Sequence, residues 1–237
     1  MALITCKNVS LGYEGQTILE NVNFEIKGGE YLCIIGENGA GKSTLVKGLL
    51  RLKKPMSGTI ELDGLKHREI GYLPQQTSAQ KDFPASVYEV VISGRLNNLS
   101  FKPFYTKEDK KDAEEKMKLM GIFELRDKCY HDLSGGQQQR VLLARAMCAT
   151  KKVILLDEPV SGLDPVVTNE LYELIHKINR EMGITVIMVS HDIEATLKYA
   201  THIIYLEKEH VFFGTKEAYL KTEKGRNYME KGEFLYV

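Results

Sequence analysis

The stretch "GENGAGKS", from Gly36 to Ser43, matches the pattern G-x-x-x-x-G-K-[ST] and decides how the rest of the sequence is interpreted. It follows the continuous apolar run "EYLCIIG", typical of a strand buried on both faces, and precedes "STLVKGLLRL", which has helical spacing. Glycines let such a loop point successive backbone N–H groups at phosphate oxygens, and the next helix adds the positive end of its dipole. We expect Lys42 to reach the outer phosphates and the Ser43 hydroxyl to ligate Mg²⁺, so the loop predicts a nucleoside triphosphate site. The residues expected to line it are Gly36, Glu37, Asn38, Gly39, Ala40, Gly41, Lys42, Ser43 and Thr44.

A second fragment of such a site ends another apolar strand. In "VILLDEP", Asp157 and Glu158 lie at the carboxyl end of the predicted strand, where α/β sheets gather their ligands. Asp157 can hold the shell of the Mg²⁺ ion, and Glu158 can act as general base or orient the attacking water. Two acids at a strand end usually mark a solvated loop, but beside a phosphate loop they indicate nucleotide hydrolysis.

Strand and helix patterns alternate along most of the chain. The segments that we interpret as strands are "ILENVNFEI", "EYLCIIG", "TIELDG", "EIGYLP", "KVILLD", "ITVIMVS" and "HIIYLE". This alternation predicts an α/β fold with a mostly parallel sheet and helices on its faces. The composition becomes charged and helical from about residue 79, so we expect an inserted α-helical subdomain over residues 79–149. Residues 1–78 and 150–237 then form the rest of a single domain, 1–237.

Two helices can be described further. After the phosphate loop, the spacing places Leu45, Leu49 and Leu52 on one side of a helix. In the charged section, Thr106 followed by Asp109 resembles a capping box. The apolar stripe expected on the helix behind that box consists of Ala113, Met117 and Met120.

Composition and charge exclude several classes of protein. The chain has 237 residues, of which 43% are hydrophobic and 27% charged, as expected for an ordinary globular protein. Lys+Arg and Asp+Glu are both 32, so no global basic field argues for a nucleic-acid partner. No apolar stretch approaches the length needed to cross a bilayer, and the start has no signal-peptide pattern. If the protein works at a membrane, we expect another chain to span it.

The thiols and imidazoles give no metal-site pattern. The four cysteines are far apart and form no C-x-x-C pair, so we expect reduced thiols without a disulfide or a metal. They are Cys6, Cys33, Cys129 and Cys148. Five histidines show no i, i+4 or clustered ligand spacing and are expected at surface or strand positions. They are His67, His131, His176, His202 and His210.

A phosphate loop alone leaves several nucleotide-binding classes open. A GTPase would need a guanine-specifying N-K-x-D, and the nearest run, "KEDKKD", lacks the asparagine. A small-molecule kinase would need a mobile lid carrying arginines, and residues 79–130 contain only Arg95 and Arg126. Neither class fits well.

The segment "LSGGQ", Leu133 to Gln137, resembles the signature of the ATP-binding cassette (ABC) family. The other family motifs follow in order and cover nearly the whole chain. Tyr13 looks like the adenine-stacking aromatic, and in "GYLPQQ" Gln75 matches the glutamine that arranges metal and water, with Gln76 as the neighbouring alternative. "SGLD", Ser161 to Asp164, matches the D-loop, and "VSHD" puts His191 at the switch histidine.

The resemblance implies a P-loop NTPase core with an N-terminal antiparallel β part. It also implies the catalytic residues Glu158, His191 and Gln75, a Mg²⁺ shell of Ser43, Gln75 and Asp157, and a D-loop Asp164. The signature would contact ATP held by a second copy of the chain, through Ser134, Gly135, Gly136 and Gln137, in a head-to-tail homodimer. His191 has a structural alternative as a helix cap preceding Asp192.

Most similar proteins of this size drive a separate membrane permease. The segment after Gln75 is where such proteins receive a permease helix, and here Phe83, Pro84, Val87 and Tyr88 offer an apolar patch with Glu89 and Arg95 at its edge. Ordinary packing of the helical subdomain is the alternative for each of these residues.

The same segment resembles cassettes of metal-ion importers for zinc, manganese or iron. The resemblance therefore implies a peripheral subunit on the cytoplasmic face of the membrane, with an extracellular or periplasmic substrate-binding protein in the same system. The rival interpretation is a single-cassette ATPase of iron–sulfur cluster assembly, without a permease.

Overall fold

Two sets of chain segments form separate units of the structure. The computed structural model describes residues 2–66, 69–75, 84–98, 104–207 and 210–230. Unit 1 comprises Met1–Leu65 and Thr185–Val237, and unit 2 comprises Lys66–Ile184. The subdomain limits expected from the sequence, near residues 79 and 149, stay a prediction.

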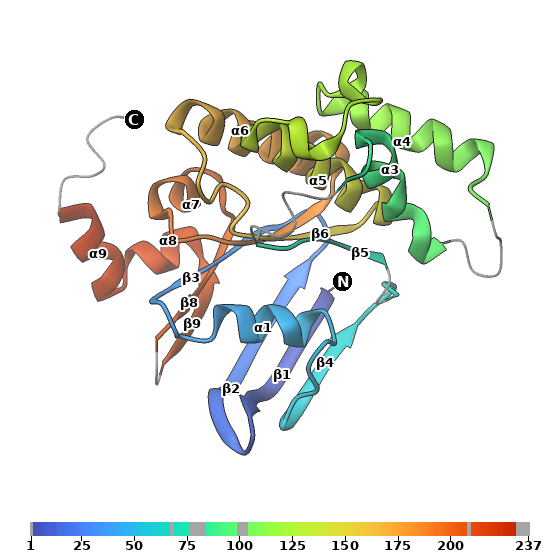
Figure 1. The fold of residues 1–237 in the computed structure, drawn as a ribbon. Coiled ribbons are helices and arrows are strands. Elements are labelled where there is room, and N and C mark those ends of the chain that lie inside the picture. Colours follow the sequence, from blue (N-terminus) through green and yellow to red (C-terminus); the bar gives the residue numbers. More distant parts are fainter. Residues whose placement is uncertain (1, 67–68, 76–83, 99–103, 208–209, 231–237) are drawn as a thin grey trace. The chain divides into compact units, whose positions relative to one another are not determined.

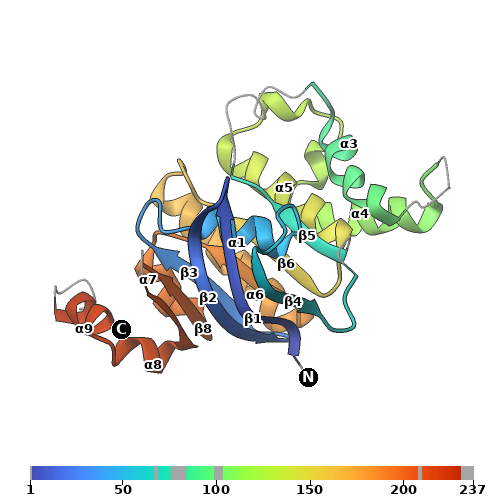
Figure 2. The ribbon, with the colours of Figure 1, turned by 90° about the horizontal axis from the view of Figure 1, so that it is seen from below.

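Unit 1 begins with a three-stranded antiparallel sheet (Figures 1 and 2). Its order is β2-β1-β4, formed by β2 (Gln16–Lys27), β1 (Ala2–Tyr13) and β4 (Ser57–Leu62). From Val22 to Lys27, buried and exposed side chains alternate along β2, which is the pattern of a strand with one face on the core. The antiparallel β part expected at the N-terminus is therefore confirmed.

The second sheet segment of unit 1 carries the phosphate loop. Here β3 (Tyr31–Gly36) lies between β7 (Thr185–Val189) and β8 (His202–Leu206) and is parallel to both. The five residues Tyr31 to Ile35 are all buried, as the continuous apolar run predicts. At the edge β9 (Val211–Thr215) pairs antiparallel with β8, a strand that the sequence patterns did not predict.

The helices of unit 1 begin with α1, Lys42–Leu49, directly after the loop. The others are α7 (Ile193–Tyr199), α8 (Lys216–Leu220) and α9 (Glu223–Glu230). Leu45 and Leu49 are fully buried, but the placement of Leu52 on the same face is wrong, because its side chain is 69% exposed. The helix ends at Leu49, and Arg51 takes a φ of 52°, which turns the chain before Leu52 is reached.

Unit 2 combines two parallel strands with a group of helices. The strands are β5 (Ile70–Leu73) and β6 (Val153–Asp157). The helices are α3 (Val87–Ile92), η2 (Ser93–Asn98), α4 (Lys107–Leu119), η3 (Phe123–Leu125), η4 (Tyr130–Asp132), α5 (Gly135–Ala149) and α6 (Pro165–Met182). Helices α3, α4 and α5 pack against one another (Figure 1). No helix within the described parts of the chain is both long and apolar enough to cross a bilayer.

The charged helix α4 follows the sequence prediction closely. Thr106 and Asp109 form the expected capping box, and the stripe of Ala113, Met117 and Met120 has no exposed surface. Arg95, expected at the edge of a partner patch, instead lies inside the unit. Its guanidinium donates to Asp109 Oδ1 at 2.9 Å and to the carbonyl of Cys148 at 3.1 Å, so it joins η2 to α4 and α5.

Candidate nucleotide site

The phosphate loop turns between β3 and α1 through a backbone that only glycine adopts readily. Gly36 and Gly41 have φ of 146° and 97°, values that L side chains rarely take. A Cβ on Gly36 would lie 2.2 Å from the carbonyl oxygen of Leu206, and one on Gly41 would lie 2.8 Å from the Leu19 side chain. Both conformation and space therefore require glycine at the two ends of the loop.

Lys42 is the first residue of α1 and is almost completely buried. Its ammonium donates to the carbonyl oxygens of Gly36 at 2.7 Å and Glu37 at 2.9 Å. These two bonds hold the positive charge against the loop backbone, at the N-terminus of the helix. Ser43 is exposed and Thr44 is buried, so the hydroxyl expected to bind Mg²⁺ is accessible.

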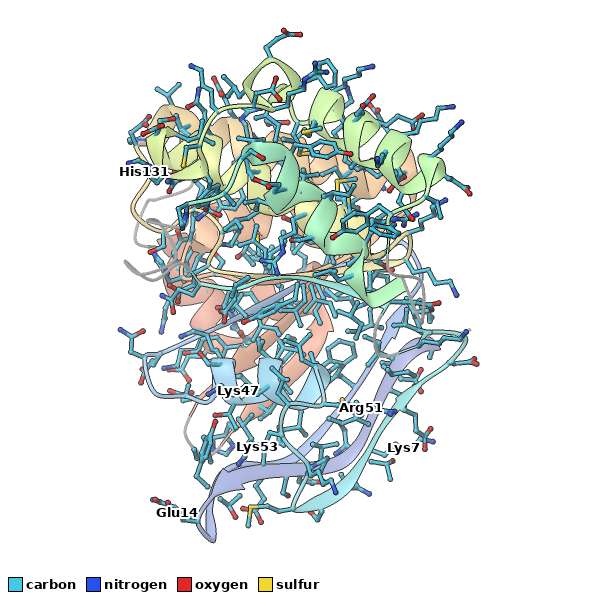
Figure 3. All side chains as sticks on the ribbon, turned by 45° about the vertical axis from the view of Figure 1, so that its right-hand side comes forward. Lys7, Glu14, Lys47, Arg51, Lys53 and His131 are labelled. Atoms are coloured by element: carbon cyan, nitrogen blue, oxygen red, sulfur yellow. The ribbon has the colours of Figure 1, made fainter. Side chains whose placement is uncertain are left out.

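Tyr13, the expected adenine-stacking ring, ends β1 and is 41% exposed. Two lysines that the sequence did not single out lie close to its ring, Lys47 of α1 and Lys53 of the turn behind that helix. Both are labelled in Figure 3. Lys53 Nζ lies 3.6 Å from the ring centroid, and Lys47 Nζ donates to the tyrosine hydroxyl at 3.2 Å. The hydrogen bond from Lys47 is the main cause that lowers the Tyr13 pKa below its usual value. One face of the ring is therefore already covered by a cation.

The structure brings together two of the predicted catalytic residues, Gln75 and Glu158. Strands β5 and β6 are parallel, with Leu73 opposite Leu156. Gln75 and Glu158 each follow two positions after these leucines, so they meet just beyond the ends of the two strands. The Gln75 side-chain N–H donates to Glu158 Oε2 at 2.8 Å. Glu158 is half-buried and has a φ of 49°, an unfavourable backbone conformation for a residue with a side chain. In this backbone conformation, the Glu158 carboxylate lies within hydrogen-bond distance of the Gln75 amide.

Asp157, the last residue of β6, is 7% exposed. Tyr72 of β5 pairs with Leu155, two residues before Asp157 on β6, and burial together with the charge and hydrogen bonding of Asp157 raises the pKa of Tyr72 to about 12. The phenol is therefore neutral near pH 7 and can donate to the carboxylate. No sequence pattern indicated this tyrosine, because its interaction with Asp157 depends on how β5 and β6 pair.

Two further predicted residues lie at helix starts. Asp164 caps α6, since its Oδ1 accepts from the backbone N–H groups of Val166 and Val167, both at 3.1 Å. His191 follows β7 with its side chain exposed, and it is Asp192 that caps α7 by accepting from Ala195 N–H at 2.9 Å. The structural alternative for His191 as the cap is therefore wrong.

The signature segment begins α5 with a capping box. The Ser134 hydroxyl accepts from the Gln137 N–H at 3.4 Å, and the Gln137 side chain accepts from the Ser134 N–H at 3.1 Å. Gly135 is exposed, and a Cβ on Gly136 would lie 2.4 Å from Val167 on α6. The helix N-terminus thus presents a small, polar surface.

The predicted permease patch is only partly accessible. Val87 is fully buried, Tyr88 is half-buried and Pro84 is exposed, while Phe83 lies outside the described residues. Any contact at Val87 would require α3 to move.

The predicted site residues are divided between the two units. Unit 1 carries the phosphate loop, Tyr13 and His191. Unit 2 carries the acids Asp157 and Glu158, the amide of Gln75 and the signature segment.

Comparisons with known proteins identify the family. The profile of the ABC transporter family matches residues 19–161. The zinc uptake system ATP-binding protein ZurA of Listeria monocytogenes is 35% identical over 92% of this chain and 87% of its own length. The manganese transport system ATP-binding protein MntB of Halalkalibacterium halodurans is 34% identical, with 99% and 98% of the two chains covered.

Two solved structures resemble the fold over most of the chain. One is an inward-facing putative metal-chelate type ABC transporter, with a TM-score of 0.86, 27% identity and 98% and 90% of the two chains covered. The other is the ATP-binding cassette MJ0796, dimeric in a post-hydrolysis state with ADP and Pi, with a TM-score of 0.74, 30% identity and 90% and 98% covered. Motifs, fold and relatives agree: the chain belongs to the ABC transporter family, as an ATP-binding subunit that hydrolyses ATP.

Proposed function

We propose that this chain powers a metal-ion uptake system, acting as a pair of copies on a separate membrane permease. The support for metal as cargo is the pair of relatives named for zinc uptake and manganese transport, both similar over most of the chain. The observation that carries the catalytic part is the 2.8 Å hydrogen bond from Gln75 to Glu158. The rival function in iron–sulfur cluster assembly is not favoured, because these relatives belong to transport systems.

In the proposed reaction, water attacks the γ-phosphorus of ATP while the bond to the ADP oxygen breaks. The Glu158 carboxylate accepts the proton of the attacking water, and Gln75 fixes the orientation of that carboxylate. Lys42 neutralises charge on the outer phosphates, and the loop N–H groups bind their oxygens. His191 would donate to the γ-phosphate, and Tyr13 would stack on adenine.

The donor set fits Mg²⁺ as the resident cation. A hydroxyl, a carboxylate and an amide oxygen are the hard ligands that Mg²⁺ prefers, and they come from Ser43, Asp157 and Gln75. The Gln75 amide donates one N–H to Glu158, so its Oε1 is the atom that can ligate a cation. When bound, Mg²⁺ supplies charge neutralisation on the phosphates.

A second copy would complete each ATP site. Ser134, Gly135, Gly136 and Gln137 would offer hydroxyl and backbone donors to ATP on the other copy, from the positive end of α5. Asp164, close behind the catalytic acids in sequence, would lie at the interface between the copies. The dimeric solved structure of a 30% identical cassette supports this arrangement.

The remaining partners follow from the transport role. Of the described residues of the expected permease surface, Pro84 and Tyr88 are accessible, and Val87 would contribute only if exposed on binding. The chain would sit at the cytoplasmic face of the membrane, and a substrate-binding protein would deliver the metal from outside.

Glu158→Gln tests the catalytic assignment. The amide cannot accept the proton of water, so we expect ATP hydrolysis to fall by about 10²-fold or more, while ATP binding is retained. In the presence of ATP, a dimer that holds unhydrolysed ATP should then accumulate. Size-exclusion chromatography with light scattering detects the dimer, and a phosphate-release assay measures hydrolysis.

Glu124→Gln is the matched control, because Glu124 is an exposed acid of η3 in the same unit and belongs to none of the motifs. Hydrolysis by Glu158→Gln at the rate of this control would overturn the general-base assignment.

A further inference from the structure

A group of three potential metal ligands lies immediately before the signature segment. The ligand atoms of Cys129, His131 and Asp132 all lie within 4.8 Å of one another. His131 Nε2 and Asp132 Oδ1 are already 3.2 Å apart. The donors of a tetrahedral Zn²⁺ site are roughly 3.3–3.8 Å apart, as follows from Zn–N and Zn–S lengths of about 2.0–2.3 Å. Side-chain rotation alone can therefore bring the three donors onto one ion.

The backbone beneath these side chains is held on several sides. Tyr130 between them is 2% exposed, its N–H donates to Ala85 O at 2.8 Å, and its carbonyl accepts from Gln138 Nε2 at 3.1 Å. Cys129 also forms an isolated antiparallel bridge with Ser86. Because these contacts hold the backbone, the Cα atoms of Cys129, His131 and Asp132 are already in place before an ion binds. Binding then has to immobilise mainly the side chains.

The side chains themselves are accessible to an ion. The side chains of His131 and Asp132 are 55% and 59% exposed, and Cys129 is half-buried. His131 lies at the surface of unit 2 (Figure 3). A thiolate, an imidazole and a carboxylate are donors that Zn²⁺ accepts together, whereas Mg²⁺ and Ca²⁺ bind oxygen ligands.

The other three thiols of the chain do not compete for such an ion. Cys6, Cys33 and Cys148 are buried, and burial raises the pKa of each to about 12, so they remain protonated near neutral pH. Of the four thiols, only that of Cys129 is not buried, so it is the one that an ion can reach in the folded protein.

We propose that Cys129, His131 and Asp132 form a binding site for a thiophilic divalent cation of the zinc class, with the fourth position open to water. The site differs from the Mg²⁺ site in both location and ligand chemistry. Only Leu133 separates it from Ser134, so a bound ion would fix the chain that leads into the signature helix. The site does not depend on the proposed transport role.

The spacing of the cysteines alone, or of the histidines alone, does not indicate this site, because its three donors come from three different residue types. The signal that could have found it is the mixed spacing C-x-H-D in "CYHD".

The test is a Co²⁺ titration of the tag-free, nucleotide-free protein, followed by absorption spectroscopy. We expect one ion per chain and a near-ultraviolet thiolate-to-cobalt charge-transfer band that Zn²⁺ abolishes by competition. Cys129→Ser should remove the band, and His131→Ala and Asp132→Asn should each weaken binding by about tenfold or more. His210→Ala, a change at an exposed histidine of unit 1, is the matched control and should bind like the unchanged protein.

A second measurement needs no variant. Alkylation of the folded protein by iodoacetamide, followed by peptide mass spectrometry, should modify Cys129 first, and Zn²⁺ should slow that modification by about tenfold or more. A cobalt complex without the thiolate band, an unchanged band in Cys129→Ser, or alkylation of Cys129 that Zn²⁺ does not slow would each overturn the proposal. Because no nucleotide is present, none of these results depends on the ATPase.

Discussion

The phosphate loop in unit 1 and the signature segment in unit 2 both place glycines where a helix begins, but they use glycine differently. In the loop, Gly36, Gly39 and Gly41 have φ of 146°, 83° and 97°, so the backbone path itself depends on them. In the signature, Gly135 and Gly136 belong to α5 and have ordinary helical backbone. What they contribute there is the absence of a side chain.

The two helix starts also differ in their caps. Helix α1 has Gly41 as N-cap and no side-chain cap, whereas α5 has the reciprocal Ser134–Gln137 box. The start of α1 leaves its backbone N–H groups available to a ligand and depends on the conformation of the phosphate loop. The capping box at the start of α5 stabilises that helix without a ligand and keeps a small polar surface exposed. We therefore expect changes in the loop to affect both folding and ATP binding, and changes in the signature to affect chiefly the pairing of two copies.

Lys42→Ala should have the largest effect. It removes the only buried lysine among the described residues, and with it the charge held at the loop carbonyls of Gly36 and Glu37. We expect ATP turnover to fall by about 10²-fold or more, with affinity measured by a fluorescent ATP analogue falling as well. Lys54→Ala, at an exposed position in the same unit, is the control. Normal turnover in Lys42→Ala would contradict the assignment of the loop.

Gly41→Ala and Gly135→Ala test the comparison directly. At Gly41 a methyl group adds roughly 1–2 kcal/mol of left-handed backbone strain and meets Leu19 at 2.8 Å, so stability and ATP affinity should both fall. At Gly135 a Cβ would meet only Leu163, at 3.3 Å, and alanine favours a helix by up to about 1 kcal/mol.

Chemical denaturation and ATP titration of the two variants measure the difference. Gly135→Ala should be as stable as the unchanged protein, and its monomer should bind ATP with the same affinity. It should weaken only the ATP-dependent dimerisation. Equal losses of stability in the two variants would mean that the two segments use glycine in the same way.

Features fixed by local chemistry could be predicted from the sequence. The buried strand, the glycine loop and the helix behind it lie where the periodicity and the motif put them, from Tyr31 to Leu49. The Thr106–Asp109 box was also predicted correctly, because a cap depends on residues only three positions apart.

Features that depend on distant segments could not be predicted. The contact between Gln75 and Glu158 depends on the register of β5 against β6, and Lys53 reaches Tyr13 only because the chain turns at Arg51. The burial of Val87 and the inward role of Arg95 depend on how α3, α4 and α5 pack. Residue spacing along the chain carries none of this information.

Ser134→Ala should have a smaller effect on the isolated chain than Lys42→Ala or Gly41→Ala, and it separates the two roles of the signature serine. Loss of the cap should lower the free energy of unfolding by about 1 kcal/mol. Thr106→Ala removes the equivalent cap from α4 in the same unit, so it serves as a control with a matched loss of stability. Both changes are then combined with Glu158→Gln, which forms an ATP-dependent dimer. If Ser134 also contacts the ATP of a second copy, only Ser134→Ala should weaken this dimer. The strength of the dimer is measured as the protein concentration at which half of the chains are paired. Equal weakening by the two variants would show that the serine acts only as a cap, because stability alone would then account for the change.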